Sequence, residues 1–456
     1  MRLAPDLLIA LMVLLPLLGG AFALVVPADD RLTLRAVGVV SGLLALVPGL
    51  ALLFEAPGAT LVLPVAASLR FSGVALPAAV VILGVTPMAL RAGAPRVSHG
   101  LQAYVAAILL AESGSLVAVL VDDVVAATAV AMVAAVPFFA LVALFGGPER
   151  GSVTLRAAAL WLLLDGAALG ALVLVQQGPV TGGGAWVVVA LLGPGLVRLA
   201  AGPHGLWALP ALEQSPVAAA CLMGGMVAPV GAVLLCRSVA LLERVGGGAE
   251  ALARVIPSLA GVLAVGCAIG GALVMAERDL RRMVAHLLGA LGSVTALVAI
   301  CGAGPVAVGL AALTGFSASW ALMLVEAVER RLETRRTTEL RGLLQVAPSL
   351  GLLLPMSLWA LCGLPGPGTA TGLWPALAGL LRKGPETGVA AGVCASSLLL
   401  AAVGISGLVL RVGGLPRPSL KQTVSVSLQQ GIRLLLPLAA LVAASLAHDA
   451  VLRVAS

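Results

Sequence analysis

The stretch GLVRLAAGPHGLWALPALEQSP, from Gly195 to Pro216, places an arginine and a histidine inside a very apolar chain. Gly202-Pro203 lies between Arg198 and His204 and is expected to break the helix, because proline lacks a backbone N–H and glycine is conformationally free. An ionisable side chain at membrane depth is costly and usually pairs with another ion or faces water. The stretch therefore predicts an interrupted transmembrane helix with a polar site at the break.

The composition sets the class of protein. Of the 456 residues, 61% are hydrophobic and only 10% are charged, which is too few charges to hydrate the surface of a soluble protein of this length. The length instead accommodates many transmembrane helices of roughly 20 residues each. The net charge of +7 fits basic cytoplasmic loops, and no basic stripe with interleaved aromatic residues points to nucleic acid.

Apolar runs bounded by charges or Gly/Pro clusters predict an all-α polytopic membrane protein with about fourteen spans. The runs lie near residues 7–26, 35–54, 74–91, 101–121, 124–145, 155–176, 185–201, 216–236, 255–276, 283–302, 305–327, 343–363, 387–411 and 426–447. We interpret the first run as a retained helix and not as a signal peptide, because it is longer than a signal core. A short run near 369–381 is interpreted as the second half of a broken helix. The stretch from Thr60 to Phe71 is too short to span and is expected to form an extended lid on one face.

Basic residues are unevenly divided between the loops. The positive-inside rule places the more basic loops, those after odd-numbered spans, in the cytoplasm and both termini outside it, in an inner (cytoplasmic) membrane. The basic residues of the odd loops are Arg31, Arg35, Arg91, Arg96, Arg150, Arg156, Arg278, Arg281, Arg282, Arg330, Arg331, Arg335, Arg336, Arg341, Arg411, Arg417 and Lys421.

A second segment of the chain is similar to the opening stretch. GPHGLWALP at residues 202–210 is answered by GPGTATGLWP at residues 366–375, and each segment couples a Gly-Pro break to a Gly-Leu-Trp step. Paired, interrupted spans in two halves of a chain are typical of transporters built from repeats, and they point to the functional centre.

Three segments in order resemble one known family. The first joins Val197-Arg198-Leu199 to Pro203-His204, Trp207, Leu209-Pro210 and Pro216-Val217; the others run from Asp279 to His286 and from Leu361 to Trp374. They resemble segments of the antiporter-like membrane subunits of respiratory complex I, of Mrp-type antiporters, and of membrane-bound hydrogenases and formate hydrogenlyases. The resemblance covers nearly the whole chain.

The resemblance implies a fold of fourteen helices with two inverted five-helix repeats and broken helices 7 and 12. The implied organisation places helices 1–3 in residues 1–100, the first repeat in 101–236, the second in 255–411, and helix 14 in 412–456. It also implies a glutamate in the fifth helix, a lysine in the seventh, a lysine or histidine in the eighth, and a lysine or glutamate in the twelfth.

This chain departs from the family at those positions. The lysine of the seventh helix is replaced by Arg198, and the fifth-helix position falls near Met132, in a segment without a carboxylate. The eighth-helix position falls near Leu222 or Met223, and no ionisable residue occurs in 313–320 or 363–381. Lysine can relay protons when burial lowers its pKa, whereas arginine stays charged, so the replacement keeps a positive centre and removes the easiest proton carrier.

Few ionisable residues remain within the predicted spans. The candidates for a proton or ion pathway are Arg198, Glu112, Asp165 and His204, and Arg198 is expected to pair with Glu112 or with Asp165. A purely structural ion pair and a helix-end role for His204 are the alternatives.

Other polar residues are expected at the ends of spans. Asp123, Asp279 and His286 are secondary candidates that are best interpreted as interface residues, and the charged run from Glu326 to Arg341 as a solvated loop or a docking surface. The six cysteines form no CxxC pair and are interpreted as small apolar side chains, so neither a metal nor another cofactor is indicated.

Two functions follow as hypotheses. The first is an antiporter-like membrane subunit of a complex I-like or hydrogenase-like oxidoreductase assembly, without redox chemistry of its own and with reduced or lost pumping. Its expected partners are other membrane subunits and the lipid bilayer. The alternative is a cation/proton antiporter subunit or a membrane partner in ion uptake; an unrelated secondary transporter is a third.

Overall fold

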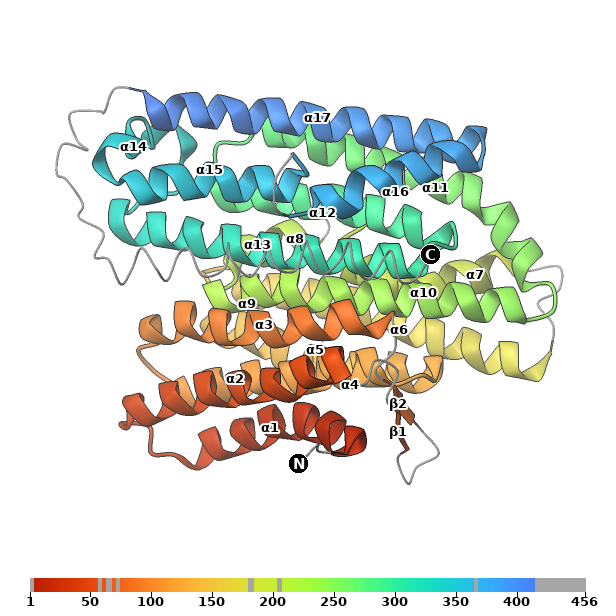
Figure 1. Cartoon of the computed structure of the whole chain (residues 1–456), viewed down its shortest axis with the longest axis horizontal. Helices are drawn as coiled ribbons and strands as arrows, with labels where there is room; N and C mark the ends of the chain where they lie inside the picture. Colours follow the sequence, from red (N-terminus) through yellow and green to blue (C-terminus); the bar gives the residue numbers. More distant parts are fainter. Residues whose placement is uncertain are drawn as a thin grey trace.

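The structure is a computed structural model that describes residues 4–55, 60–62, 68–70, 74–178, 184–202, 207–364 and 368–414. These residues form a bundle of helices with one short hairpin (Figure 1). The first part of the chain contains α1 (Pro5–Val25), α2 (Arg31–Glu55), β1 (Thr60–Val62), β2 (Ser68–Arg70), α3 (Ala75–Gly93), η1 (Ala94–Arg96), α4 (Leu101–Leu120), α5 (Val124–Phe145), α6 (Arg150–Gln177), α7 (Gly184–Arg198) and α8 (Ala208–Gln214). The second part contains α9 (Val217–Leu222), η3 (Met223–Val227), α10 (Ala228–Arg244), α11 (Gly248–Ala276), α12 (Leu280–Ile300), α13 (Gly304–Leu332), η4 (Thr337–Glu339), α14 (Leu343–Val346), α15 (Pro348–Cys362), α16 (Ala370–Lys383) and α17 (Pro385–Gly413).

The predicted class, an all-α polytopic membrane protein, is confirmed, whereas the count of fourteen spans stays a prediction. Within the described residues, 11 helices are long and apolar enough to cross a membrane, and α7 and α15 are shorter apolar helices. Each predicted span from 7–26 to 387–411 coincides with a helix or with consecutive helices, whereas 426–447 lies outside the described residues. The protein is therefore a multi-pass membrane protein with interrupted helices where the sequence placed them.

Several boundaries differ from the prediction. The sixth, eighth and ninth spans extend beyond the predicted ends as α6, α9–η3–α10 and α11, because a helix continues past its apolar run into the polar boundary. The twelfth predicted span, 343–363, is not one helix. It is divided at Ala347, where α15 begins with Pro348, and proline is suited to the first position of a helix.

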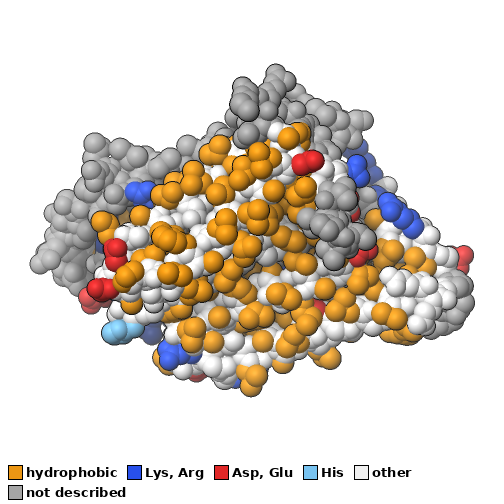
Figure 2. All heavy atoms as spheres, turned by 90° about the horizontal axis from the view of Figure 1, so that it is seen from below, with side chains coloured by type: hydrophobic (Ala, Val, Ile, Leu, Met, Phe, Trp, Pro, Cys, Tyr) orange, Lys and Arg blue, Asp and Glu red, His pale blue; other side chains and the backbone are white. Residues whose placement is uncertain are grey.

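The helices lie side by side and approximately parallel, from α1 and α2 at one edge to α11 and α17 at the other (Figure 1). The span α9–η3–α10 and helix α12 are buried throughout their apolar length, and α13 is almost as buried. Helices α5 and α6 bury only a minority of the residues in their apolar segments. On the face of α1 and α2, hydrophobic side chains cover the middle and most charged ones lie toward the ends, as expected for a surface in lipid (Figure 2).

The predicted extended segment is a small antiparallel hairpin. Thr60 pairs with Arg70, and Val62 pairs with Ser68. The hairpin lies at the end of α4, where the backbone N–H of Asp122 donates to the Ser68 carbonyl and Leu69 forms a bridge with Val121. It therefore covers the end of α4.

The centre of the bundle is packed backbone to backbone. Met223–Val227 forms one turn of π-helix, and its Gly224 lies against Gly315 of α13. A Cβ at Gly315 would lie 2.2 Å from the Gly224 carbonyl oxygen. Ser319 of α13 donates to the carbonyl of Cys221 in α9 at 2.8 Å and ties α13 to the turn just before the π-helix. The expected eighth-helix position, near Leu222 or Met223, is thus the start of a tightly packed turn.

Candidate functional site

Two charges that the sequence placed in the sixth and seventh spans form a buried ion pair. The Arg198 guanidinium donates to both carboxylate oxygens of Asp165, at 2.6 and 2.7 Å. The two side chains are only 2% and 1% exposed. Parallel bonds of this kind match the fork of the guanidinium to the carboxylate and fix both groups. Of the two partners that the sequence left open, the structure selects Asp165, and pairing of Arg198 with Glu112 is wrong.

Local structure explains how α7 and α6 hold this pair. Arg198 is the last residue of α7, so its positive charge lies at the negative end of the helix dipole. Its guanidinium also donates to the Pro194 carbonyl, one turn back, at 3.1 Å. The Trp161 ring lies 4.7 Å from the centre of the guanidinium, one helical turn before Asp165 on α6. Arg198 thus has a carboxylate, a carbonyl and an aromatic face as neighbours, which restrict it to one position.

A cavity of about 20 Å³ lies beside Arg198, with room for about one water molecule. The fifth span lines it only with apolar residues, Ala131, Ala134, Ala135 and Phe138. Helix α5 therefore offers the guanidinium no acid, and the counterion comes from α6. The other lining residues include Ser115 of α4 and four residues at or near the π-helix.

Glu112 occupies a different environment one helix away. It is fully buried in α4, and neither carboxyl oxygen has a hydrogen-bond partner among the described residues. The Thr86 hydroxyl of α3 interacts with it, but this hydroxyl donates its proton to the Ile82 carbonyl at 3.2 Å. Ala111 and Ser115, its neighbours on α4, line the cavity, but Glu112 itself does not. It is therefore a carboxyl group without a cation.

The second interruption, between α15 and α16, has neutral hydrogen bonds and no ion pair among its described residues. The Thr369 hydroxyl donates to the carbonyls of Ala360 and Leu361, at 2.8 and 2.9 Å. The indole N–H of Trp374 donates to the Gly363 carbonyl at 2.6 Å. Gly363 has a φ of 80°, which permits the chain to leave the helix there. The two similar segments, 202–210 and 366–375, thus correspond to two interruptions with different chemistry.

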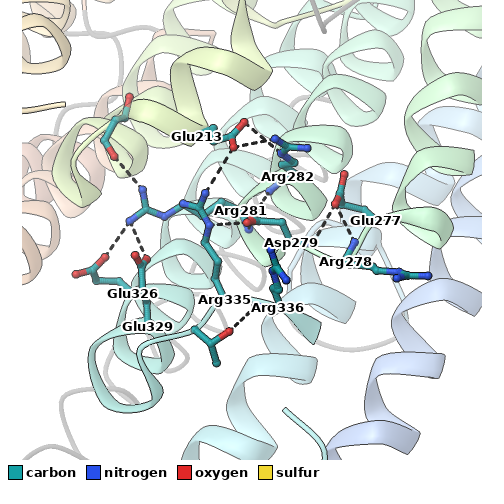
Figure 3. A network of polar contacts seen from close by, with 12 residues as sticks. Glu213, Glu277, Arg278, Asp279, Arg281, Arg282, Glu326, Glu329, Arg335 and Arg336 are labelled. Carbon is teal, nitrogen blue, oxygen red and sulfur yellow. Dashed lines mark hydrogen bonds and ion pairs between the residues drawn. The ribbon is translucent and has the colours of Figure 1, made fainter. Parts of the chain in front are cut away.

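A network of ion pairs that the sequence did not predict joins the ends of α8, α12 and α13 (Figure 3). Glu326 is 2% exposed and pairs with Arg96, Arg281 and Arg330. Arg281 also pairs with Glu329 at 3.2 Å. The prediction of a solvated loop is therefore wrong for the start of the run, because Glu326 still lies inside α13 and is buried. The only signal in the sequence was an acidic residue four positions before Arg330.

The secondary candidates lie at helix ends or beside them. Asp123 caps α5 by accepting from the Ala126 N–H at 2.7 Å. Asp279 caps α12 and pairs with Arg335 at 2.5 Å. His286 is buried about two turns further along α12, 3.7 Å from a carboxylate oxygen of Glu277. His204 lies outside the described residues, and the six cysteines are free, five of them buried.

This arrangement defines a class: a multi-pass membrane protein with two interrupted helices and a buried ion pair at one of them. Residues 104–399 match the family described as NADH:quinone oxidoreductase/Mrp antiporter, transmembrane. The chain belongs to this family. No curated protein is significantly similar to it in sequence.

Solved structures share the fold over nearly the full length. A chain of the membrane-bound sulfane sulfur reductase, an archaeal respiratory membrane complex, is similar with a TM-score of 0.82 and 16% identity, over 98% of this chain and 96% of that one. A chain of respiratory complex I from Thermus thermophilus with bound NADH is similar with a TM-score of 0.79 and 20% identity, over 96% and 95%. The overall fold is shared with these two chains.

Proposed function

We propose that this chain is the antiporter-like membrane subunit of a complex I-like or hydrogenase-like respiratory assembly, and that other membrane subunits are its partners. Support comes from the family and from the fold shared with chains of two respiratory membrane complexes. The electron chemistry of such an assembly would belong to its partners.

Within this assembly, the first broken helix does not relay protons. The observation that carries this proposal is the bidentate bond between Arg198 and Asp165. A relay group must gain and lose a proton during each cycle, and arginine does not lose its proton in proteins. A guanidinium bound to both carboxylate oxygens also fixes the position of Asp165. The site is therefore a fixed structural pair.

The central packing supports the same proposal. At the expected eighth-helix position the π-helix carries Gly224 and Gly225, and α13 carries Gly315 opposite them. These helices approach so closely that no side chain could be added between them, and Thr314 and Ser317 of α13 are buried without hydrogen-bond partners among the described residues. A proton path needs water or titratable groups, and neither 223–227 nor 313–320 contains a titratable residue.

The face that carries the α3–α4, α5–α6 and α11–α12 connections is proposed to face the cytoplasm. We call it the arginine-rich face. Several of its connections touch: Arg31 donates to the Ser98 carbonyl, and the N–H of Thr337 donates to the Arg278 carbonyl. Its basic residues favour the cytoplasmic side of an inner membrane. The division into repeats at 101–236 and 255–411 is proposed with this orientation.

A cation/proton antiporter subunit is the second candidate. The observation that favours it is Glu112, which is buried, titratable and not neutralised by a cation. A carboxyl of this kind could carry a proton on its own, without Arg198.

The experiment is proton translocation by the assembly reconstituted in lipid vesicles, with a pH-sensitive dye inside and the proton-to-electron ratio as the readout. Glu112→Gln removes the titratable proton at nearly constant shape, and Arg156→Gln on the exposed side of α6 is the control. We expect the ratio to be the same for both variants and the native chain. A lower ratio for Glu112→Gln with assembly intact would show that protons cross this chain through Glu112, outside the first broken helix. That result would contradict the lack of a proton path proposed for the centre of the bundle and favour the second candidate.

A further inference from the structure

An open pocket of about 590 Å³ lies on the arginine-rich face, apart from the buried ion pair. It is enclosed by the α3–α4 and α5–α6 connections, the turn between α8 and α9, and the ends of α12 and α13. Figure 3 shows part of its wall, where Arg281 and Arg335 lie between Glu213, Glu326 and Glu329.

The charges that line this pocket are unbalanced. Four arginines, Arg96, Arg150, Arg281 and Arg335, face two glutamates. Three of the arginines are held in place by carboxylates: Arg96 and Arg281 by Glu326, and Arg335 by Asp279. The pocket is therefore a set of donors fixed before any ligand arrives, which lowers the entropic cost of binding.

Arg150 differs from the other three. Its guanidinium donates only to the Gly146 carbonyl, at 3.3 Å, and no carboxylate among the described residues pairs with it. It is exposed at the start of α6, and the neighbouring Glu149 does not line the pocket. Arg150 is thus the cation available to an anion, and a guanidinium binds phosphate oxygens bidentately.

The rim of the pocket indicates where that phosphate comes from. Leu144, near the end of α5, lines the pocket and is 61% exposed. Val133 and Val136 are 68% and 64% exposed, and the spacing of the three residues places them on one side of α5. The pocket therefore continues into an outward apolar stripe that runs along a membrane helix. A molecule with a phosphate at one end and an acyl chain at the other fits both parts, whereas a free phosphate uses only the first.

We propose that this pocket binds the phosphate of an anionic phospholipid, with Arg150 as its main cation and the acyl chains along Val133, Val136 and Leu144. The site is independent of proton transport and of the partners of the chain.

The test is native mass spectrometry of the full chain in detergent, titrated in turn with phosphatidylglycerol, phosphatidylcholine and sodium phosphate. We expect one site that prefers phosphatidylglycerol and that Arg150→Gln weakens by about tenfold or more, as loss of a charge-assisted bond predicts. Leu144→Ser should lower the affinity for phosphatidylglycerol. It should leave the affinity for free phosphate unchanged. Arg156→Gln, on the same helix and outside the pocket, is the matched control and should bind like the native chain. Circular dichroism of each variant verifies its fold.

Three results would overturn the proposal. Equal binding of phosphatidylcholine would show that charge does not select the lipid. Full displacement of phosphatidylglycerol by equimolar phosphate, with no effect of Leu144→Ser, would assign the pocket to a soluble anion. Equal affinities of Arg150→Gln and Arg156→Gln would remove Arg150 from the site.

Discussion

The two interrupted helices of this protein share a sequence pattern and differ in chemistry. At the first, α7 ends in Arg198, whose guanidinium is bound to Asp165 and lies against Trp161. At the second, α15 ends before Gly363, and the described polar contacts are neutral hydrogen bonds from Thr369 and Trp374. Among the described residues, the protein therefore closes one interruption with a salt bridge and the other with neutral hydrogen bonds.

The difference shows that a break in a membrane helix does not itself require an ion. Backbone carbonyls released by a break need donors, and a hydroxyl or an indole supplies them at small cost. A buried charge needs a full counterion, and removing one member of such a pair leaves an uncompensated charge. The first interruption is thus expected to be the more vulnerable of the two.

The largest expected effect tests that vulnerability directly. Arg198→Met leaves Asp165 buried without its cation, and we expect it to destabilise the protein by about 3–5 kcal/mol. Thermal unfolding in detergent, followed by tryptophan fluorescence, measures the change. The double variant Asp165→Leu/Arg198→Met removes both charges and should regain most of the loss. A double variant as unstable as the single one would mean that packing, and not charge, governs this interruption.

A smaller effect is expected at the contact between α13 and the π-helix Met223–Val227. Gly315→Ala places a Cβ 2.2 Å from the Gly224 carbonyl, so α13 and the π-helix must separate, at a cost of about 1–3 kcal/mol. The control is Gly261→Ala in α11, where a Cβ meets nothing within 4 Å and should be neutral or slightly stabilising. The same unfolding assay compares them. Equal stability of the two variants would contradict the close packing described for the centre.

The second interruption should respond more weakly still. Thr369→Val removes the hydroxyl that donates to Ala360 and Leu361 while keeping the side-chain shape, and we expect a loss of about 1 kcal/mol. Thr371→Val is the control, because its hydroxyl makes one longer bond in a partly exposed position. A loss for Thr369→Val as large as that of Arg198→Met would abolish the distinction between the two interruptions.

The smallest effect is expected at Glu112. Its carboxyl has no cation to lose, so Glu112→Gln should change the free energy of unfolding by less than about 1 kcal/mol. Chemical denaturation at fixed detergent concentration gives this value. A loss comparable with that of Arg198→Met would reveal a partner of the carboxylate and would place a second charged site beside the cavity.

The sequence predicted more of the fold than of the site. Apolar runs located the helices because a span must be long and apolar, and Gly-Pro pairs located both interruptions because their backbone cannot continue a helix. It did not decide between Glu112 and Asp165, since both are acids at the middle of a predicted span. It also missed the burial of Glu326, because hydropathy averages over a charged run and cannot tell which side of α13 faces inward.

The sequence by itself determined that the chain lies in a membrane, where its helices run and where two of them break, since these follow from local hydrophobicity and backbone geometry. Only the tertiary structure decided which acid neutralises Arg198, which acid stays alone, and how the arginines of one face surround a pocket. Those outcomes depend on which sides of non-adjacent helices meet, and that arrangement is fixed by packing across the whole bundle.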